Sequence, residues 1–263
     1  MKKTTLFFIA SSFLHFQASA GVIFQDDFEY GNLNKTMNGA FWANGAYANV
    51  TDKGPALSGT HSLKFTYKPG KNSWAEQRFD LGGKYSDIWI KWSIYIPQNF
   101  EKNGSRNNKL MYVDSRKTPE TNNLNMYTGF EHWGDTIIGT QQAYQNSSSI
   151  GWMWADPPLK FLDSTEDKGK WHTFIFHLKK ADSPNSSNGL IQVWKDGRLR
   201  MNITNLNNYS NGYNAYETGY LMGWANSGYS ETENTYFYID DVVFSDEPIS
   251  ITRPKSATSI RIK

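Results

Sequence analysis

Tyrosine, histidine and tryptophan side chains that could bind or transform a ligand lie on segments of alternating polarity. In the predicted strand at residues 125–133, Tyr127, Glu131 and Trp133 share one face, and His132 lies on the other. A phenol can donate or accept a proton when its surroundings tune it. Tyr127 is therefore a candidate acid or base and Trp133 a candidate binding ring, whereas we expect His132 to be a core or edge histidine.

A second alternating segment, residues 88–96, carries Trp89, Lys91 and Tyr95 on the face opposite its isoleucines. A large ring left in water often marks a binding surface, so this face could line a substrate groove. An ordinary solvated face fits the pattern equally well, because a period of two does not tell which sheet surface a face meets. Trp89, Lys91 and Tyr95 are thus candidate substrate-binding residues.

Two further polar candidates stand on predicted strands. His177, in residues 171–179, could move a proton, although an imidazole beside a core usually serves only as a hydrogen-bond partner. Gln141, in residues 136–145, is a candidate substrate-binding residue through its amide.

Paired acids stand near both ends of the chain, at Asp26-Asp27 and Asp240-Asp241. If the strands that carry them are neighbours, Asp27 and Asp241 could bind a structural Ca²⁺, which takes about six to eight oxygen ligands. The competing interpretation is that these acids cap turns or pair with lysine and arginine.

Many short alternating segments separated by turns must position these residues. Such a pattern predicts an all-β sandwich or barrel. The step from Lys195 to Arg198 through Asp196-Gly197 predicts a two-residue hairpin. Residues 157–167 could hold one short helix. The predicted strands span residues 61–67, 74–79, 88–96, 109–113, 125–133, 136–145, 171–179, 190–194, 199–203, 220–224 and 235–244.

The ends of the chain differ from its middle. Residues 1–20 have a charged start, an apolar run and an A-x-A site, which are typical of a cleaved signal peptide of bacterial type. We expect a protein that is secreted or periplasmic, with one domain over residues 21–250 and a basic tail over 251–263.

The balance of acidic and basic residues limits the kinds of partner that we expect. The chain has 27 lysines and arginines and 25 acids, and the expected leader removes Lys2 and Lys3, which leaves 25 of each. Because nucleic acids and anionic membranes attract a basic excess, neither is an expected partner.

The chain has no cysteine, which excludes disulfides and thiol chemistry. We expect a monomer.

Three sets of segments resemble the concanavalin A-like jelly-roll superfamily, and within it the secreted polysaccharide lyases of the alginate, glucuronan and heparin lyase-like kinds. They are residues 169–179 with 188–197, residues 75–78 with 88–100 and 108–110, and the ends DDFE and YIDDVV. The resemblance implies a jelly-roll β-sandwich of two antiparallel sheets. It also implies β-elimination on an acidic, uronate-containing glycan.

β-Elimination on a uronate needs a group that offsets the carboxylate, a base and an acid. The resemblance places Arg78 at the substrate carboxylate and Lys109 at the substrate, although Glu76-Gln77-Arg78 stands where these lyases carry an Arg-x-Glu-like element. No metal or nucleotide cofactor is required for such a reaction. The E-x-D-x-x-E spacing of related glucanases is absent, which argues against hydrolysis by paired carboxylates.

Ends like DDFE and YIDDVV also occur in carbohydrate-binding jelly rolls that catalyse nothing. A second hypothesis is therefore a lectin that holds polysaccharide through Trp89, Tyr95 and Trp133. A surface or structural protein without a sugar ligand is a third.

Overall fold

The computed structural model describes residues 21–100, 108–115, 127–133, 137–144, 147–154, 162–163, 165–209, 214–226 and 228–251. The side chains of Tyr127, Trp133 and residues 137–144 and 147–154 lie outside this description. So do residues 1–20 and 252–263, on which the expected leader and most of the expected tail fall.

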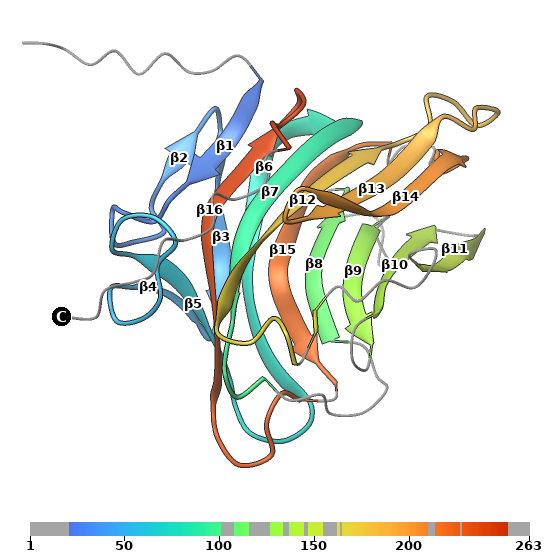
Figure 1. Ribbon diagram of the computed structural model, residues 1–263. Coiled ribbons are helices and arrows are strands. Elements are labelled where there is room, and N and C mark those ends of the chain that lie inside the picture. The colour runs from blue at the N-terminus through green and yellow to red at the C-terminus, as the bar shows by residue number, and fades with distance from the viewer. Residues whose placement is uncertain are drawn as a thin grey trace, which may run out of the picture.

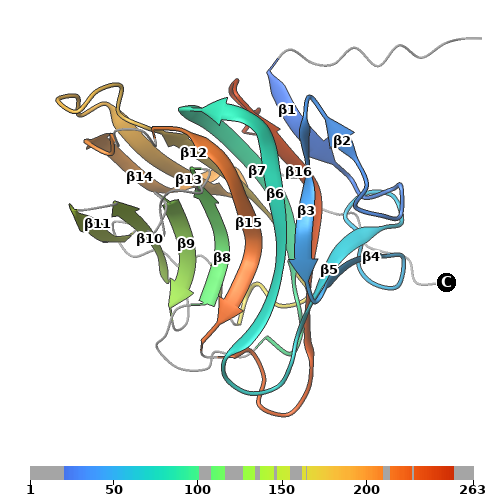
Figure 2. The same cartoon turned by 180° about the vertical axis from the view of Figure 1, so that it is seen from behind.

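The strands form two antiparallel sheets, which confirms the expected all-β sandwich (Figures 1 and 2). Sheet A has the order β14 (Arg198–Leu206), β13 (Gly189–Lys195), β12 (Lys170–Lys179), β7 (Asp87–Ile96), β16 (Thr235–Ser245), β5 (Ser62–Tyr67) and β4 (Ala48–Thr51), and β1 (Val22–Asp26) also pairs with β16. Sheet B has the order β11 (Ser147–Trp154), β10 (Ile137–Tyr144), β9 (Tyr127–Trp133), β8 (Asn108–Asp114), β15 (Tyr216–Ala225), β6 (Ser73–Tyr85), β3 (Ala40–Ala46) and β2 (Thr36–Met37).

No helix occurs among the described residues, including the described part of the segment 157–167. Within those same residues, nothing has the length and apolarity of a membrane-spanning helix.

Strand β7 shows why these residues form a sandwich. Its isoleucines and Trp92 are fully buried, as the alternation predicts, while Trp89, Lys91 and Tyr95 face outward and stay partly exposed. Trp92 stacks on Phe176 of β12, with ring centroids 5.6 Å apart. Phe176 also meets Phe130 of sheet B at 4.7 Å, so aromatic rings join the two sheets.

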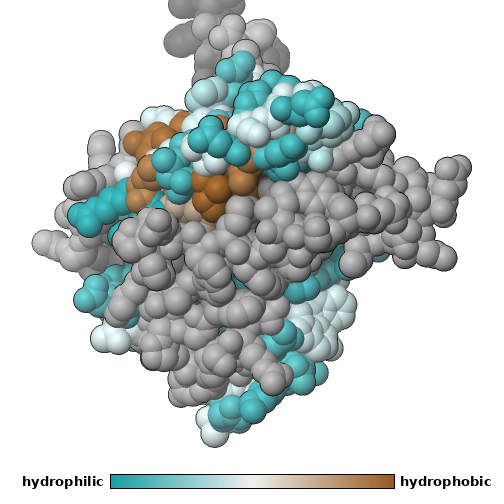
Figure 3. Space-filling view, turned by 90° about the vertical axis from the view of Figure 1, so that its right-hand side faces the viewer, coloured by the Kyte–Doolittle hydropathy of each residue, from teal (hydrophilic) through white to brown (hydrophobic). Residues whose placement is uncertain are grey.

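Sheet A ends in β14 and sheet B ends in β11 on the same side of the molecule (Figure 1). Figure 3 views this side and shows an apolar patch among hydrophilic residues. Apolar side chains therefore reach the surface at this end of the sandwich.

The hairpin at residues 195–198 is confirmed. Lys195 pairs with Arg198, and the two turn residues Asp196 and Gly197 have φ values of 51° and 71°. Two consecutive positive φ angles are the signature of the type I′ turn that matches strand twist. The turn also supports sheet A, because the Asp196 carboxylate accepts a hydrogen bond from the Thr173 backbone N–H at 2.9 Å.

A buried phenol connects the two sheets. Tyr67 ends β5 in sheet A, and its hydroxyl lies within hydrogen-bond distance of the carbonyl groups of Ala75 and Gly223 in sheet B, at 3.0 and 2.8 Å. The hydroxyl oxygen also accepts the Gly223 N–H at 3.2 Å. Burial raises the pKa of Tyr67, which keeps the phenol a neutral donor. Tyr67 thereby fixes β15 at Gly223, where the pairing of β15 with β8 is irregular.

We expect Tyr67→Phe to lower the free energy of unfolding by about 1–3 kcal/mol, because buried polar groups at Gly223 and Ala75 lose their partner. Urea denaturation followed by fluorescence measures this. Tyr236→Phe is the matched control, since Tyr236 is 37% exposed and its loss should cost under about 0.5 kcal/mol. Equal midpoints for the two variants would contradict the bridging role.

Candidate active site

The outward face of sheet B places one row of residues across five strands. Arg78 of β6 pairs with Tyr220 of β15, and Tyr220 pairs with Tyr112 of β8. Tyr112 pairs with Gly129 of β9, which pairs with Gln141 of β10. Register partners on adjacent strands lie about 4.5–5.5 Å apart, so the row brings a cation and two phenols onto one surface.

Lys109 and two tyrosines form the centre of this face. The Lys109 ammonium donates a hydrogen bond to the Tyr220 hydroxyl at 3.3 Å and lies 4.8 Å from the centroid of the Tyr112 ring. The Tyr112 and Tyr220 rings are stacked, with centroids 5.1 Å apart and planes 8° from parallel. The ammonium stabilises negative charge on the Tyr220 oxygen, which is the property that a proton-transferring phenol needs.

A buried carboxylate fixes the position of Tyr112. The Tyr112 hydroxyl donates a hydrogen bond to Glu131 of β9, which is fully buried. Gly129 makes room for the ring, because a Cβ at this position would lie 2.6 Å from the Tyr112 ring. We call Lys109, Tyr112, Glu131 and Tyr220 the sheet B cluster.

Arg78 is oriented by its neighbour on β6. Its Nε donates to Glu76 Oε1 at 2.6 Å, and the other oxygen of Glu76 accepts the Trp74 indole N–H at 2.8 Å. Glu76 is buried, whereas the Arg78 side chain is 57% exposed. The remaining guanidinium donors are therefore presented at the surface, where they could bind a carboxylate.

Irregular pairing is what brings Lys109 and Tyr112 to one face. A regular strand would put these two residues on opposite faces, but the register of β8 against β9 shifts between Lys109 and Met111. Beside it, Gly223 of β15 has a φ of 136°. A Cβ there would lie 2.9 Å from the Tyr220 ring and 3.2 Å from the Lys109 Cβ, so the glycine permits their contact.

Five of the candidate site residues that the sequence predicts fall on sheet B. Arg78 and Lys109 lie on the face just described. Gln141 lies in the register row, and Tyr127 pairs with Asp114 of β8 in the next row. Trp133 ends β9 and pairs with Ile137. The side chains of Tyr127, Trp133 and Gln141 lie outside the described residues. His132 is buried and faces Tyr229, as expected of a core histidine.

The structure does not bring Trp89, Lys91, Tyr95 or His177 to this site. All four lie on the outward face of sheet A, on the opposite side of the core. Trp89 stacks on His177 at 4.0 Å, and both nitrogens of His177 have partners, Asp87 at 2.8 Å and Gln192 at 3.2 Å. The alternation of residues 88–96 separated core from surface correctly, but it could not indicate which sheet the surface belongs to.

Tyr112 and Tyr220 were missed in the sequence. Both lie within predicted strands, and a tyrosine on a strand is ordinary in an aromatic-rich β protein. Nothing in the sequence distinguishes them from the other tyrosines, because the bulge in β8 and the irregular stretch of β15 become visible only in the structure.

The acid pairs at the chain ends are neighbours, as predicted, because β1 pairs with β16 and Asp26 faces Val242. Asp27 and Asp241 line one surface depression of about 290 Å³, together with Lys35 and Lys91. The two lysines make the depression a mixed-charge site, which fits the pairing of acids with lysines better than a calcium cage. The described residues contain no group of three acids or histidines that could hold a metal ion.

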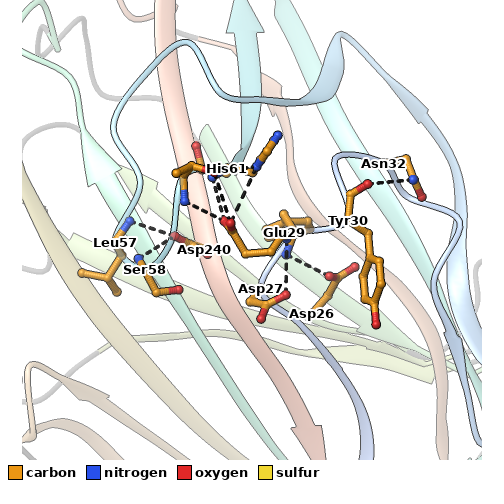
Figure 4. Close-up of polar contacts among 12 residues, drawn as sticks. Asp26, Asp27, Glu29, Tyr30, Asn32, Leu57, Ser58, His61 and Asp240 are labelled. Carbon is orange, nitrogen blue, oxygen red and sulfur yellow. Dashed lines mark hydrogen bonds and ion pairs between the residues drawn. The ribbon is translucent and has the colours of Figure 1, made fainter.

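Neighbouring carboxylates of this region serve the backbone (Figure 4). Asp240 accepts the N–H groups of Leu57 and Ser58 at 2.8 and 3.1 Å, and Glu29 accepts those of Thr60 and His61 at 2.9 and 2.7 Å. Burial raises the pKa of Asp240 to about 6. Asp240 thus holds the loop at residues 52–61 against β16, and Glu29 holds the same loop against the segment that follows β1.

Two charged groups, Asp114 and Lys180, lie in the interior at the end of the register rows. Asp114 accepts a hydrogen bond from the Thr218 hydroxyl at 2.6 Å, and burial raises the pKa of Asp114 to about 6. Lys180 is fully buried, its ammonium lies 4.7 Å from the Tyr216 ring centroid, and it has no hydrogen-bond partner among the described residues. Burial lowers the pKa of Lys180 to about 8. Both charged forms therefore destabilise the folded protein at neutral pH.

We expect Lys180→Met to stabilise the protein at pH 7 by about 1–4 kcal/mol, because burial lowers the pKa of Lys180 even with the Asp114 carboxylate nearby, so the charged ammonium is less stable in the folded chain than in the unfolded one. The folded pKa near 8 lies below the ordinary 10.5, so the destabilisation is complete below pH 8 and fades as the pH rises to 10.5. The gain should shrink over the same interval. Urea unfolding at pH 7 and at pH 10 measures it, with the exposed Lys53→Met as control. A gain that does not depend on pH would contradict the assignment.

Comparisons with known proteins agree with this fold. The polysaccharide lyase family model matches residues 28–243. The endo-β-1,4-glucuronan lyase of the fungus Trichoderma reesei is 14% identical, with a TM-score of 0.64 over 90% of this chain and 100% of that chain. An alginate lyase from a Chlorella virus is 10% identical, with a TM-score of 0.61 over 85% and 99%. The binding domain of Paraclostridial Mosquitocidal Protein 1 is 10% identical, with a TM-score of 0.55 over 88% and 50%.

No curated protein sequence matches the chain. At these identities the solved structures show the fold alone, and the jelly-roll resemblance inferred from the sequence is confirmed. The family match spans far more than half of the residues. The chain therefore belongs to the polysaccharide lyase family.

Proposed function

We propose that this polysaccharide lyase cleaves a uronate-containing acidic glycan by β-elimination on the outward face of sheet B. The observation that carries the proposal is the contact of Lys109 with Tyr220, one register position from Arg78. A cation for the carboxylate and a phenol for the proton thus stand together on this face.

The reaction removes the proton at C5 of the uronate and breaks the bond from C4 to the glycosidic oxygen. The electron pair left at C5 forms the C4–C5 double bond, and the leaving oxygen receives a proton. Offsetting the carboxylate makes the C5 proton removable, and this electrostatic effect is commonly a large part of such catalysis.

Each role has a candidate on this face. The exposed donors of Arg78 would bind the uronate carboxylate. Tyr220 would exchange the proton, and Lys109 would stabilise the charge on its oxygen during that exchange. Tyr112, held by Glu131, would fix the position of Tyr220 by stacking. Tyr127, in the adjacent row, is the candidate for the second proton transfer.

The substrate class is supported by the two lyases of similar fold, whose names give glucuronan and alginate as substrates. Both polymers carry carboxylates on their sugars. We propose that the protein acts as a monomer, outside the cytoplasm of a bacterium, without a nucleic-acid or membrane partner. The near-equal numbers of acidic and basic residues support the last point.

Tyr220→Phe and Lys109→Met should each lower kcat by about 10²-fold or more, because each removes a group from the proton transfer. The assay follows ultraviolet absorbance of the unsaturated uronate product on alginate, glucuronan, heparin and hyaluronan. Lys71→Ala, an exposed lysine away from the cluster, is the control and should keep full activity.

A folded wild-type protein that produces no absorbance on any of the four glycans would overturn the proposed substrate class. Binding of one of them without cleavage would favour the lectin instead. Repeating the assay and a thermal melt with EDTA tests the structural calcium predicted at Asp27 and Asp241. A Tm that EDTA lowers and added Ca²⁺ restores would support that ion, provided that EDTA does not lower the Tm of the Asp241→Asn variant.

A further inference from the structure

Three large aromatic side chains are exposed together at one end of the proposed catalytic face. Trp74 of β6 is 37% exposed, Trp224 of β15 is 40% exposed, and Tyr47 between β3 and β4 is 53% exposed. Trp74 and Trp224 are direct register partners, so their side chains leave the same face of sheet B side by side. Tyr47 meets the edge of the Trp74 ring, with centroids 6.4 Å apart.

This aromatic group forms a separate row on the same face of sheet B, displaced along β6 and β15 from the row that contains Arg78 and Tyr220. Trp74 lies four residues from Arg78 along β6, and Trp224 lies four residues from Tyr220 along β15. Four residues of strand span about 13 Å, which is more than one sugar ring. A polysaccharide cleaved at Tyr220 would therefore reach Trp74 and Trp224 with a neighbouring sugar when it runs along the strands.

The group is also built into the site rather than scattered on the surface. Glu76 is buried and binds the indole N–H of Trp74 with one oxygen and Nε of Arg78 with the other. The same carboxylate thus positions a binding ring and the proposed carboxylate-binding cation. On the outer side, the Lys68 ammonium lies 5.1 Å from the Tyr47 ring centroid, which adds a positive charge beside the rings.

We propose that Tyr47, Trp74 and Trp224 form an aromatic subsite that binds a sugar of the polysaccharide beyond the cleavage position, with Lys68 facing its acidic group. The C–H face of a pyranose packs on an exposed indole, and such a ring stays exposed only at a cost unless a ligand covers it. The subsite makes long chains better substrates than short ones. This inference rests on the proposed function, because it assumes cleavage at the sheet B cluster.

The test uses Trp224→Ala with a polymer and with the shortest oligosaccharide that the wild type cleaves. Trp224→Ala should raise KM for the polymer about tenfold or more, which is the usual effect of truncating an aromatic anchor, and change kcat little. For the short oligosaccharide, KM should stay the same. Trp224→Tyr, which keeps a flat ring, should restore most of the polymer affinity.

Tyr236→Ala provides a matched control on the other sheet. Tyr236 is 37% exposed, and the Lys64 ammonium lies 5.4 Å from its ring centroid, so it repeats the chemistry of the subsite without its location. It should leave both KM values unchanged. A Trp224→Ala variant that lowers kcat on both substrates without the difference in KM would overturn the subsite.

Affinity electrophoresis in gels that contain polysaccharide separates this inference from the proposed chemistry. If a glycan retards the wild type and Trp224→Ala abolishes the retardation, the subsite is supported even when no cleavage is seen. If Trp224→Ala and wild type are retarded equally, or if no glycan of the panel retards the wild type, the subsite is overturned. Cleavage that persists in the Tyr220→Phe variant would instead count against the proposed catalytic roles.

Discussion

The bond between a phenol of one sheet and the backbone of the other is the constraint on which the site depends. Tyr67 enters from β5, and its hydroxyl engages Gly223 through both its N–H and its carbonyl. At this point β15 departs from regular pairing with β8. The departure opens the space in which the Lys109 side chain reaches Tyr220. A core contact between two sheets thus sets the position of surface residues that could do chemistry.

The face of sheet B also holds several carboxylates that are buried at a free-energy cost. Glu76 and Glu131 recover that cost through hydrogen bonds from Arg78, Trp74 and Tyr112. Each of these bonds orients a donor that would touch substrate or support one that does. Asp114, nearby, accepts a hydrogen bond from the Thr218 hydroxyl, and burial raises its pKa to about 6. These buried hydrogen bonds therefore fix the positions of the side chains more than they stabilise the fold.

The fold could be predicted from the sequence where alternation is regular, and the site could not where it breaks. Residues 88–96 alternate without interruption, and the structure buries the expected side chains. Arg78 and Lys109 were available from the resemblance, but Tyr112 required a bulge to join Lys109 on one face. Trp89 illustrates the remaining limit, because two sheets offer two outward faces and a single strand cannot choose between them. Strands β3 and β11 were missed, since Asn, Gly and Ser weaken their pattern.

The position of β16 has a consequence for how the chain reaches this structure. It lies between β7 and β5 and also pairs with β1, yet among the strands it comes last in the sequence. Sheet A therefore remains in three separate parts until residues 235–245 are available: the four strands from β14 to β7, the pair β5 and β4, and β1 alone. Pairings across such long separations close large loops, which slows folding. In the interval β5 and β7 present unpaired edges, and these are the surfaces at which a folding chain is most exposed to association with other strands.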